Sequence, residues 1–460
     1  MQTKYVHFTV GMLCVMLAFP VRAFVGEDAL ETVMPPVAVD PDGDVNVFSS
    51  PFYYRNGMIF VVHVEPPPAG MAETPLNLRT VVRKGVLDAD GRWQWQATTL
   101  EPRTLKDGYH TQGSIALDRK GYVHVVYNMH DMPWQYSVSR LPYDIRRFEF
   151  RGQSLSQEML AIVKLENRSP FPDVGSAAIP GNQITYPRFF VDRKGELYIT
   201  YRYSLRPARH WGERAFGGGL ARYDTATRRW KSLGGALTIS KEDAQLPGDV
   251  TQYTQHPFAF DEHYIVLYIE LAFDKNNGMH AIWTWRYSGP GGDTVKPSYA
   301  YSPDGGAHFY RADHKTLYTL PINYADADEI TDVPGPYWAE KAIAAFDPEK
   351  PELILFPIGG PRRLFSRVQP SDGHYWQSDG DSPWGATDLV IDKEGVQWLI
   401  ASGLKIFTRK YMWQPWVMVL DMQQQYRQPR VEYVSEENAL YIHAKSGDYK
   451  SAVIFKFNLK

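Results

Sequence analysis

Cysteine is almost absent from this sequence: Cys14 is the only one among 460 residues, and it lies inside an apolar N-terminal segment. The chain beyond that segment therefore has no disulfide, no cysteine nucleophile and no cysteine ligand for a metal. An excess of one charge is lacking too, since 49 Lys and Arg accompany 52 Asp and Glu, for a formal net charge of -3. That balance disfavours a nucleic acid as the partner, because proteins that coat nucleic acids carry a strong positive excess.

A long hydrophobic run is missing as well. The apolar stretch from Phe8 to Phe19 follows Lys4 and is shorter than the roughly 20 residues that a membrane-spanning helix needs. A short apolar run that follows a positive charge and ends near a small residue, here Ala23, is typical of a secretory signal peptide. We therefore expect residues 1–23 to be removed on export. Residues 24–460 should then form one domain, extracellular or periplasmic, with no membrane span.

The motifs of several large enzyme classes do not occur in the sequence. There is no His-Glu-x-x-His zinc motif, no Walker loop, no Gly-x-Ser-x-Gly nucleophile elbow and no Gly-x-Gly-x-x-Gly dinucleotide fingerprint. Each of these motifs places particular groups around a metal, a phosphate or a scissile bond. Their absence argues against the metalloproteases, nucleotide hydrolases, serine hydrolases and dehydrogenases that use them.

The residues that are abundant suit many short strands. Aromatic residues make up 14% of the chain, and 36 Gly and 33 Pro supply frequent turns. One phrase recurs: an apolar residue, Asp, two or three polar residues and Gly, then alternating apolar positions. The clearest copies span residues 116–127 and 191–201, looser copies begin at Asp274 and Asp392, and a degenerate copy begins at Asp347. Each copy predicts a tight turn between antiparallel strands, with Asp capping the turn and Gly supplying a positive φ.

A second turn pattern supports a particular architecture. Residues 302–309 fit the Asp box, Ser-x-Asp-x-Gly-x-x-aromatic, which occurs in sialidase-like propellers. Repeated hairpins without a convincing amphipathic helix predict an all-β propeller in which each sheet packs on its neighbours. The uneven spacing of the Asp anchors predicts long loops between some strands. The C-terminal strands, residues 439–443 and 453–457, are expected to close the ring against early strands.

Polar side chains fall at matching positions in neighbouring hairpins. The antiparallel pairing predicted for the second copy places Tyr186 opposite Tyr201 and beside Arg202. The pairing predicted for the first copy places His110 near His130 at the equivalent end. We expect two imidazoles, one phenol and guanidinium groups to line one pocket on a single face of the ring: His110, His130, Tyr186, Arg202 and Arg286.

Each of these residues also has an ordinary structural interpretation. A histidine at a strand end is more often a hydrogen-bonded structural residue than a catalytic one, and Tyr186 could be a packing aromatic. The arginines could lie over aromatic rings. Only the shared position of the set favours a functional site. For His124, which alternates onto the same side as Tyr122 and Val126, we expect packing in the core.

The expected set favours β-elimination from a uronate polymer over hydrolysis. A glycosidase uses two carboxylates that flank the glycosidic bond, and this set has none. In β-elimination, arginine pairs with the uronate carboxylate and stabilises the charge that develops as the C5 proton leaves. Histidine or tyrosine takes that proton, and tyrosine can protonate the leaving oxygen at C4. No cofactor is required for this chemistry.

Three segments carry a resemblance to a known family: His110 with Gly113 and Asp118, the run from Tyr127 to Pro133, and Thr185 to Phe189 followed by Tyr201 and Arg202. They resemble the BNR-repeat propeller lyases, in particular ulvan lyases of polysaccharide lyase family 25 and, behind them, family 24. The resemblance implies a seven-bladed propeller secreted by a bacterium that degrades algal polysaccharide. It further implies cleavage of ulvan, a sulfated rhamnose–uronate polymer, at the C4 side of glucuronate or iduronate, which leaves unsaturated uronate ends.

The resemblance also implies roles for individual residues. His110 and Tyr186 would transfer protons, and His130 and Arg202 would bind and neutralise the uronate. A further tyrosine is expected after Arg202, and Tyr253 is taken for it as a substrate-binding residue. Some relatives hold a structural zinc partly through cysteine. A structural zinc or calcium ion in this chain would have to rest on His and carboxylate ligands, which the sequence does not identify.

Two alternatives stay open at this point. The same repeat serves rhamnose–glucuronate lyases and rhamnosidases that act on plant gums, and a non-catalytic carbohydrate-binding propeller would also fit. Propeller architecture by itself does not decide among them. In the leading interpretation the partner is the anionic polysaccharide ulvan, and we expect the protein to be monomeric.

Overall fold

The structure is a computed structural model that describes most of the chain. The described residues are 30–41, 49–74, 77–101, 112–130, 132–152, 179, 181–205, 216–240, 252–288, 294–330, 341–343, 353–356, 363–367, 375–411, 413–423 and 425–459. Within these ranges every regular element is a β-strand. The same ranges contain no helix with the length and apolar character that a membrane crossing requires.

The described strands form seven four-stranded antiparallel sheets and one two-stranded hairpin. The sheets nearest the N-terminus contain β2 (Phe52–Arg55), β3 (Met58–Glu65), β4 (Arg79–Leu87) and β5 (Trp93–Thr99); β6 (Ser114–Leu117), β7 (Val123–Val126), β8 (Tyr136–Ser139) and β9 (Phe148–Phe150); and β10 (Asn182–Val191), β11 (Leu197–Ser204), β12 (Phe216–Asp224) and β13 (Arg229–Ser232). The hairpin that follows consists of β14 (Leu237–Ser240) and β15 (Gln252–Gln255).

The second half of the chain repeats the same sheet order. Its sheets contain β16 (Tyr264–Phe273), β17 (Met279–Tyr287), β18 (Thr294–Ser302) and β19 (Asp328–Glu329); β20 (Lys341–Ile343), β21 (Leu353–Phe356), β22 (Arg363–Arg367) and β23 (Trp376–Asp381); and β24 (Ala386–Ile391), β25 (Gln397–Ala401), β26 (Lys405–Arg409) and β27 (Val417–Asp421). The last sheet contains β28 (Tyr426–Val434), β29 (Ala439–Ser446), β30 (Ser451–Asn458) and β1 (Leu30–Ala38).

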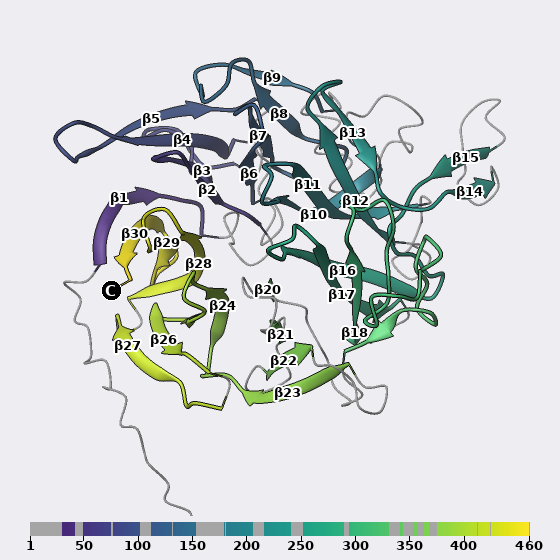
Figure 1. Ribbon diagram of the computed structural model, residues 1–460. Helices are drawn as coiled ribbons and strands as arrows, with labels where there is room; N and C mark the ends of the chain where they lie inside the picture. Colours follow the sequence, from purple (N-terminus) through teal and green to yellow (C-terminus); the bar gives the residue numbers. More distant parts are fainter. Residues whose placement is uncertain are drawn as a thin grey trace, which may run out of the picture.

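The sheets are arranged radially around a common centre (Figure 1). The first strand of each sheet lies innermost and contacts the first strand of the next, in the closed order β2, β6, β10, β16, β20, β24, β28 and back to β2. Apolar side chains fill the space between adjacent sheets, among them Trp283, Trp285 and Trp398, which are almost completely buried. The prediction of an all-β propeller is confirmed.

The ring is closed by strands from the two ends of the described chain. β1 pairs antiparallel with β30, with Leu30 opposite Phe457 and Ala38 opposite Ser451. β1 is thus the outermost strand of the sheet that begins with β28. The expectation that the C-terminal strands close against early strands is confirmed.

The recurring Asp turn folds as its sequence predicts. At Asp118, the carboxylate Oδ1 accepts hydrogen bonds from the backbone N–H groups of Lys120 and Tyr122, each at 2.9 Å. The turns at Asp192, Asp274 and Asp392 repeat this pair of bonds. At the Asp274 turn it is Asn277, with φ of 67°, that takes the left-handed position in place of the expected Gly. The degenerate copy at Asp347 lies outside the described residues.

Turns from neighbouring sheets contact one another around one end of the ring. The bonds between them are Arg55 Nη1 to the Asp118 carbonyl (2.6 Å), Arg119 to Glu196 (3.4 Å), Asn277 Nδ2 to Asp192 Oδ2 (2.8 Å) and Lys393 N–H to the Tyr433 hydroxyl (3.1 Å). We call this end of the ring the turn face and the opposite end the site face. Because strands in each sheet alternate in direction, the loop between the third and fourth strands also lies at the turn face.

Two further expectations from the sequence are met. In the Asp box, Ser302 Oγ donates to Asp304 Oδ1 at 2.9 Å and accepts from the Gly306 N–H at 2.8 Å, while Phe309 is buried. His124 is fully buried, and its Nδ1 lies 2.6 Å from the Tyr136 hydroxyl. His124 is therefore a core residue, as its alternation predicts.

Candidate active site

Tyr186 sits in a bulge of the innermost strand β10. The pairing of β10 with β11 runs through Thr185 opposite Arg202 and resumes at Arg188 opposite Thr200, so Tyr186 and Pro187 together face a single residue, Tyr201. The expected position opposite Tyr201 and beside Arg202 is confirmed. Tyr186 has φ of 56°, and a non-glycine residue in this region stores about 1–3 kcal/mol of strain. Such strain concentrates at sites where a side chain must point in an unusual direction.

Arg202 is held against the Tyr186 ring. Its guanidinium carbon lies 5.1 Å from the ring centroid of Tyr186 and 4.6 Å from that of Phe216, and only 5% of the residue is exposed. Stacking engages the faces of a guanidinium, whereas its N–H groups lie in its plane. The arrangement therefore fixes the direction in which Arg202 can present hydrogen bonds to a carboxylate.

Tyr201 is distinguished from Tyr186 by its surroundings. The Tyr201 ring packs edge-on against Trp134 with a centroid distance of 4.9 Å. Burial raises the pKa of Tyr201 well above its ordinary value, so its phenol keeps its proton. Tyr186 is only half-buried. Of the two facing tyrosines, Tyr186 is therefore the more exposed.

Tyr268 is a residue of this site that the sequence reasoning missed. It lies in β16 within a second bulge, between the pairs Leu267–Thr284 and Glu270–Ile282, and has φ of 51°. The rings of Tyr268 and Tyr186 are 5.1 Å apart. A signal was present in the sequence, because Tyr268 precedes Asp274 by the same six positions that separate Tyr186 from Asp192.

A buried ion pair joins the two bulges directly beneath the tyrosines. Arg188 follows Tyr186 by two positions, Glu270 follows Tyr268 by two positions, and their side chains form a salt bridge between neighbouring sheets. Arg188 is 8% exposed and Glu270 1%. Thr200 Oγ1 also donates a hydrogen bond to the Ile269 carbonyl at 2.8 Å. These contacts hold the two tyrosine-bearing segments in one fixed arrangement.

The segment that follows His130 is attached to the same strand. Met132 and Ile184 exchange backbone hydrogen bonds of 3.3 and 2.8 Å, and Ile184 is two positions before Tyr186. His130 itself is half-buried in the loop between β7 and β8. The structure therefore brings the His130 and Tyr186 segments side by side, as the sequence predicts.

The remaining residues expected in the site are His110, Tyr253 and Arg286. His110 lies outside the described residues. Tyr253 lies in β15, opposite Ile239 of β14, and Figure 1 shows this hairpin at the outer edge of the ring, whereas β10 and β16 line its centre. Arg286 is half-buried near the end of β17, opposite Ile265 of β16. It is at the site face, in the second strand of its sheet.

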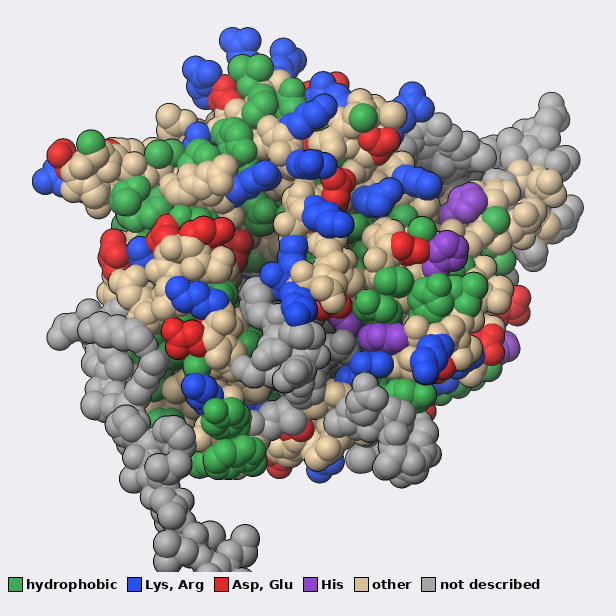
Figure 2. All heavy atoms as spheres, viewed as in Figure 1, with side chains coloured by type: hydrophobic (Ala, Val, Ile, Leu, Met, Phe, Trp, Pro, Cys, Tyr) green, Lys and Arg blue, Asp and Glu red, His purple; other side chains and the backbone are tan. Residues whose placement is uncertain are grey.

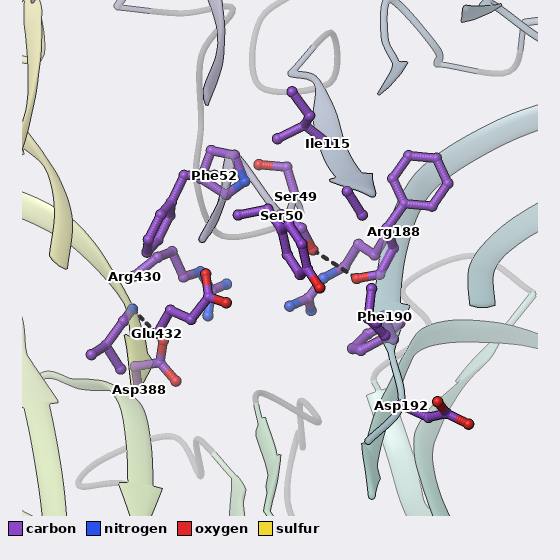
Figure 3. A pocket seen from close by; sticks show the side chains of 16 residues that line it. Ser49, Ser50, Phe52, Ile115, Arg188, Phe190, Asp192, Asp388, Arg430 and Glu432 are labelled. Carbon is purple, nitrogen blue, oxygen red and sulfur yellow. Dashed lines mark hydrogen bonds between the residues drawn. The ribbon is translucent and has the colours of Figure 1, made fainter. Parts of the chain in front are cut away.

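A polar pocket of about 360 Å³ occupies the centre of the ring, further toward the turn face. In Figure 3, Arg188 enters it from β10, Arg430 and Glu432 from β28, and Asp388 from β24. Asp388 Oδ2 accepts a hydrogen bond from the Val431 N–H at 2.9 Å. Burial, together with the Glu432 carboxylate, raises the pKa of Tyr53 in the pocket wall. Arg188 thus links the pocket to the tyrosine bulges above it.

Metal ligands do not gather in the part of the chain that the structure describes. No group of three His, Cys, Asp or Glu side chains there is close enough to hold a metal ion. The open question of a structural zinc or calcium ion therefore gains no candidate ligand set from these residues.

A family model described as "BNR repeat-containing family member" matches residues 77–352. None of the curated proteins matches the sequence. Among solved structures, the polysaccharide lyase Uly1 is 10% identical, with a TM-score of 0.58 and coverage of 94% of this chain and 100% of that one. A family 25 ulvan lyase bound to -[GlcA(1-4)Rha3S]- is 11% identical, with a TM-score of 0.60 and coverage of 92% and 95%.

At these identities the likeness to the two lyases shows a shared fold. The family match is of a different kind, because it follows from the sequence itself and extends over more than half of the chain. It begins near β4 and ends near β21, and so includes both tyrosine bulges and Arg202. This chain belongs to the BNR repeat-containing family.

Proposed function

We propose that this protein is a secreted polysaccharide lyase that cleaves ulvan by β-elimination next to a glucuronate or iduronate. The observation that carries the proposal is the strained Tyr186, held opposite Tyr201 with the Arg202 guanidinium against its ring. This places a proton-transfer group beside a cation that pairs with carboxylates.

The proposed reaction uses the residues as follows. Arg202 and His130 bind the uronate carboxylate, and the positive charge of Arg202 together with hydrogen bonds from both residues stabilises the carbanion-like state at C5. Tyr186 or His110 accepts the C5 proton, the bond between C4 and its oxygen breaks, and a C4–C5 double bond forms. The departing oxygen takes a proton from the tyrosine, so one chain becomes two and no water is consumed.

The choice of ulvan rests on the shared fold. The solved structures with the same architecture include a ulvan lyase with a bound glucuronate–rhamnose sulfate segment, and the residues quoted from the sequence resemble that family. We further propose that the seven four-stranded sheets are the seven blades of the complete ring, that residues 1–23 direct export, and that the protein acts as a monomer.

The decisive experiment combines product analysis with one substitution. The protein is incubated with ulvan and with other uronate polysaccharides, and products are followed by ultraviolet absorbance and mass spectrometry. A lyase gives absorbing unsaturated ends and products whose masses lack added water. Products that contain added water would show a hydrolase, and retention of the polymer without shortening would show a binding protein.

Tyr186→Phe should abolish the new absorbance while the fold persists, because the ring and its contacts stay and only the hydroxyl is lost. Tyr287→Phe is the matched control, since Tyr287 is 50% exposed in β17 and has no assigned role. Activity of Tyr186→Phe equal to that of the control would remove Tyr186 from the mechanism.

A further inference from the structure

The loop between β26 and β27 exposes two large aromatic side chains. Trp413 is 77% exposed and Tyr411 39%. Their exposure contrasts with the almost complete burial of Trp283, Trp285 and Trp398. Keeping a large apolar side chain in water forgoes roughly 1.5–3 kcal/mol of burial. Figure 2 shows exposed hydrophobic side chains gathered at the edge of the ring where β27 lies in Figure 1. We call Tyr411 and Trp413 the aromatic pair.

The aromatic pair is held in a defined arrangement. The two rings are parallel to within 3°, with centroids 5.5 Å apart, which is an offset stack. The turn beneath them is fixed by Gln414, whose N–H donates to the Tyr411 carbonyl at 3.0 Å. Its Oε1 accepts from the N–H groups of Lys410 and Tyr411, each at 3.2 Å. Tyr411 therefore supports one face of the Trp413 indole, and the other face is exposed to solvent. Because the indole is already held in place, it loses less conformational entropy when a ligand stacks on it.

One cation flanks the aromatic pair at the surface, and a second lies buried below it. The Lys410 ammonium lies 5.9 Å from the Tyr411 ring centroid. Beneath the loop, the Arg409 guanidinium lies 4.4 Å from the Trp416 ring. A flat apolar face beside a cation matches the two features of an acidic polysaccharide, the C–H face of a pyranose ring and its carboxylate or sulfate.

The aromatic pair cannot belong to the candidate active site, because it lies on the other side of the ring. β26 and β27 are the third and fourth strands of their sheet, so their loop is at the same end as the Asp392 turn, the turn face. Tyr186 and Arg202 are at the site face. A chain bound at Trp413 would thus be held without being cleaved.

We propose that Trp413, stacked on Tyr411 and flanked by Lys410, is a second polysaccharide-binding site that holds an acidic polymer on the turn face. The identity of the polymer rests on the proposed function, but the existence of the site does not. An interface with another protein is less well matched, since two rings and one cation cover far less than the roughly 1,000 Å² that a specific protein interface needs.

The test separates binding from cleavage. Binding of the full chain carrying Tyr186→Phe to ulvan, and to other anionic polysaccharides, is measured by retardation in polymer-containing gels. Adding Trp413→Ala should weaken the apparent affinity seen as retardation by about 5-fold or more, which corresponds to the roughly 1–3 kcal/mol that a base gains by stacking on an aromatic side chain. Turnover of short oligosaccharides by Trp413→Ala without the Tyr186 change should stay at the wild-type rate.

Two variants make the result specific. Leu141→Ala is the matched control, because Leu141 is 57% exposed in the loop between β8 and β9, the equivalent loop of another sheet; it should not change retardation. Lys410→Gln should reduce the sensitivity of binding to salt. Retardation of Trp413→Ala equal to that of the control overturns the proposal. A wild-type dimer that Trp413→Ala converts to a monomer also overturns it, since the pair would then contact a second copy of the chain. If ulvan is never cleaved but Trp413→Ala still weakens binding, the site stands and the proposed function falls.

Discussion

Arg202 is the residue on which the proposed chemistry depends most directly. Its guanidinium is bracketed by the rings of Tyr186 and Phe216, and this stacking sets the plane of its hydrogen-bond donors. A lysine at the same place would keep the charge but would present it as a point without a preferred plane. The site therefore depends on the direction of the hydrogen bonds as much as on the charge.

Arg202→Lys should lower kcat/KM on ulvan by roughly 10- to 100-fold, because a hydrogen bond to a charged group contributes about 1.5–3 kcal/mol. Initial rates of absorbance change over a range of polymer concentrations measure the effect. Arg222→Lys, in β12 near the turn face, is the control for the same exchange away from the site. If both variants retain the wild-type kcat/KM, Arg202 does not pair with the uronate.

The sequence predicts this residue pair well and its surroundings poorly. Tyr186 and Arg202 are separated by an Asp turn whose capping bonds fix the register of the hairpin, so their juxtaposition follows from counting along the chain. Tyr268 approaches from another sheet. Its distance from Tyr186 depends on how sheets pack around the ring, which no local pattern specifies. Tyr253 lies in β15, which pairs with β14 in a separate two-stranded hairpin, so counting along the chain does not place it relative to Tyr186.

At the scale of strands, the two bulges in β10 and β16 are features that the sequence does not predict. A bulge adds one residue to one strand, and alternation of apolar and polar residues continues on both sides of it. In β10 and β16 the bulges turn Tyr186 and Tyr268 toward each other, and the Arg188–Glu270 pair fixes them from below. Turns and hairpins were predictable because Asp, Gly and strand periodicity act locally.

Glu270→Gln should lower the free energy of unfolding by about 3 kcal/mol, because Arg188 would keep its buried charge without a counter-charge. Urea unfolding followed by tryptophan fluorescence measures the change. The double variant Arg188→Met with Glu270→Leu should regain much of that stability, since no charge is then buried.

The same double variant separates stability from positioning. If the ion pair orients the tyrosines, the double variant should stay folded and yet lose turnover, mainly in kcat. A double variant with both wild-type stability and wild-type kcat would show that the pair only fills the space between the sheets.

At the scale of the whole molecule, a pair of histidines lies where the first complete sheet meets the last. His63 of β3 and His443 of β29 are fully buried, and their Nε2 atoms are 2.8 Å apart. Burial lowers the pKa of His63 well below its ordinary value and lowers that of His443 to about 3. Lys445, also fully buried, adds to both shifts. The folded ring therefore needs both imidazoles to be neutral.

This requirement makes the ring sensitive to acid. The folded-state pKa values lie below the ordinary value of 6.5, so the folded state binds fewer protons than the unfolded state, and the stability present above pH 6.5 is lost as the pH falls through 6.5 toward the folded values. The loss should reach about 1.4 kcal/mol per pH unit for each histidine. Urea unfolding at a series of pH values below 6.5 should show it, and His63→Gln should flatten the curve. Identical slopes for wild type and His63→Gln would exclude His63 as a source.

The pairing of β1 with β30 has a consequence for how the molecule is made. The last sheet takes its outer strand from the start of the described chain and its inner three from the end, so a ribosome must finish almost the whole polypeptide before that sheet can assemble. Until then, β1 has no strand to pair with, and its free backbone N–H and C=O groups can pair with a strand of another chain instead. The pairing of β1 with β30 joins residues that lie farther apart in the sequence than any other strand pairing in the described part of the chain. Contacts between residues so far apart slow folding. The nascent chain should accordingly remain vulnerable to proteases until its final strands emerge.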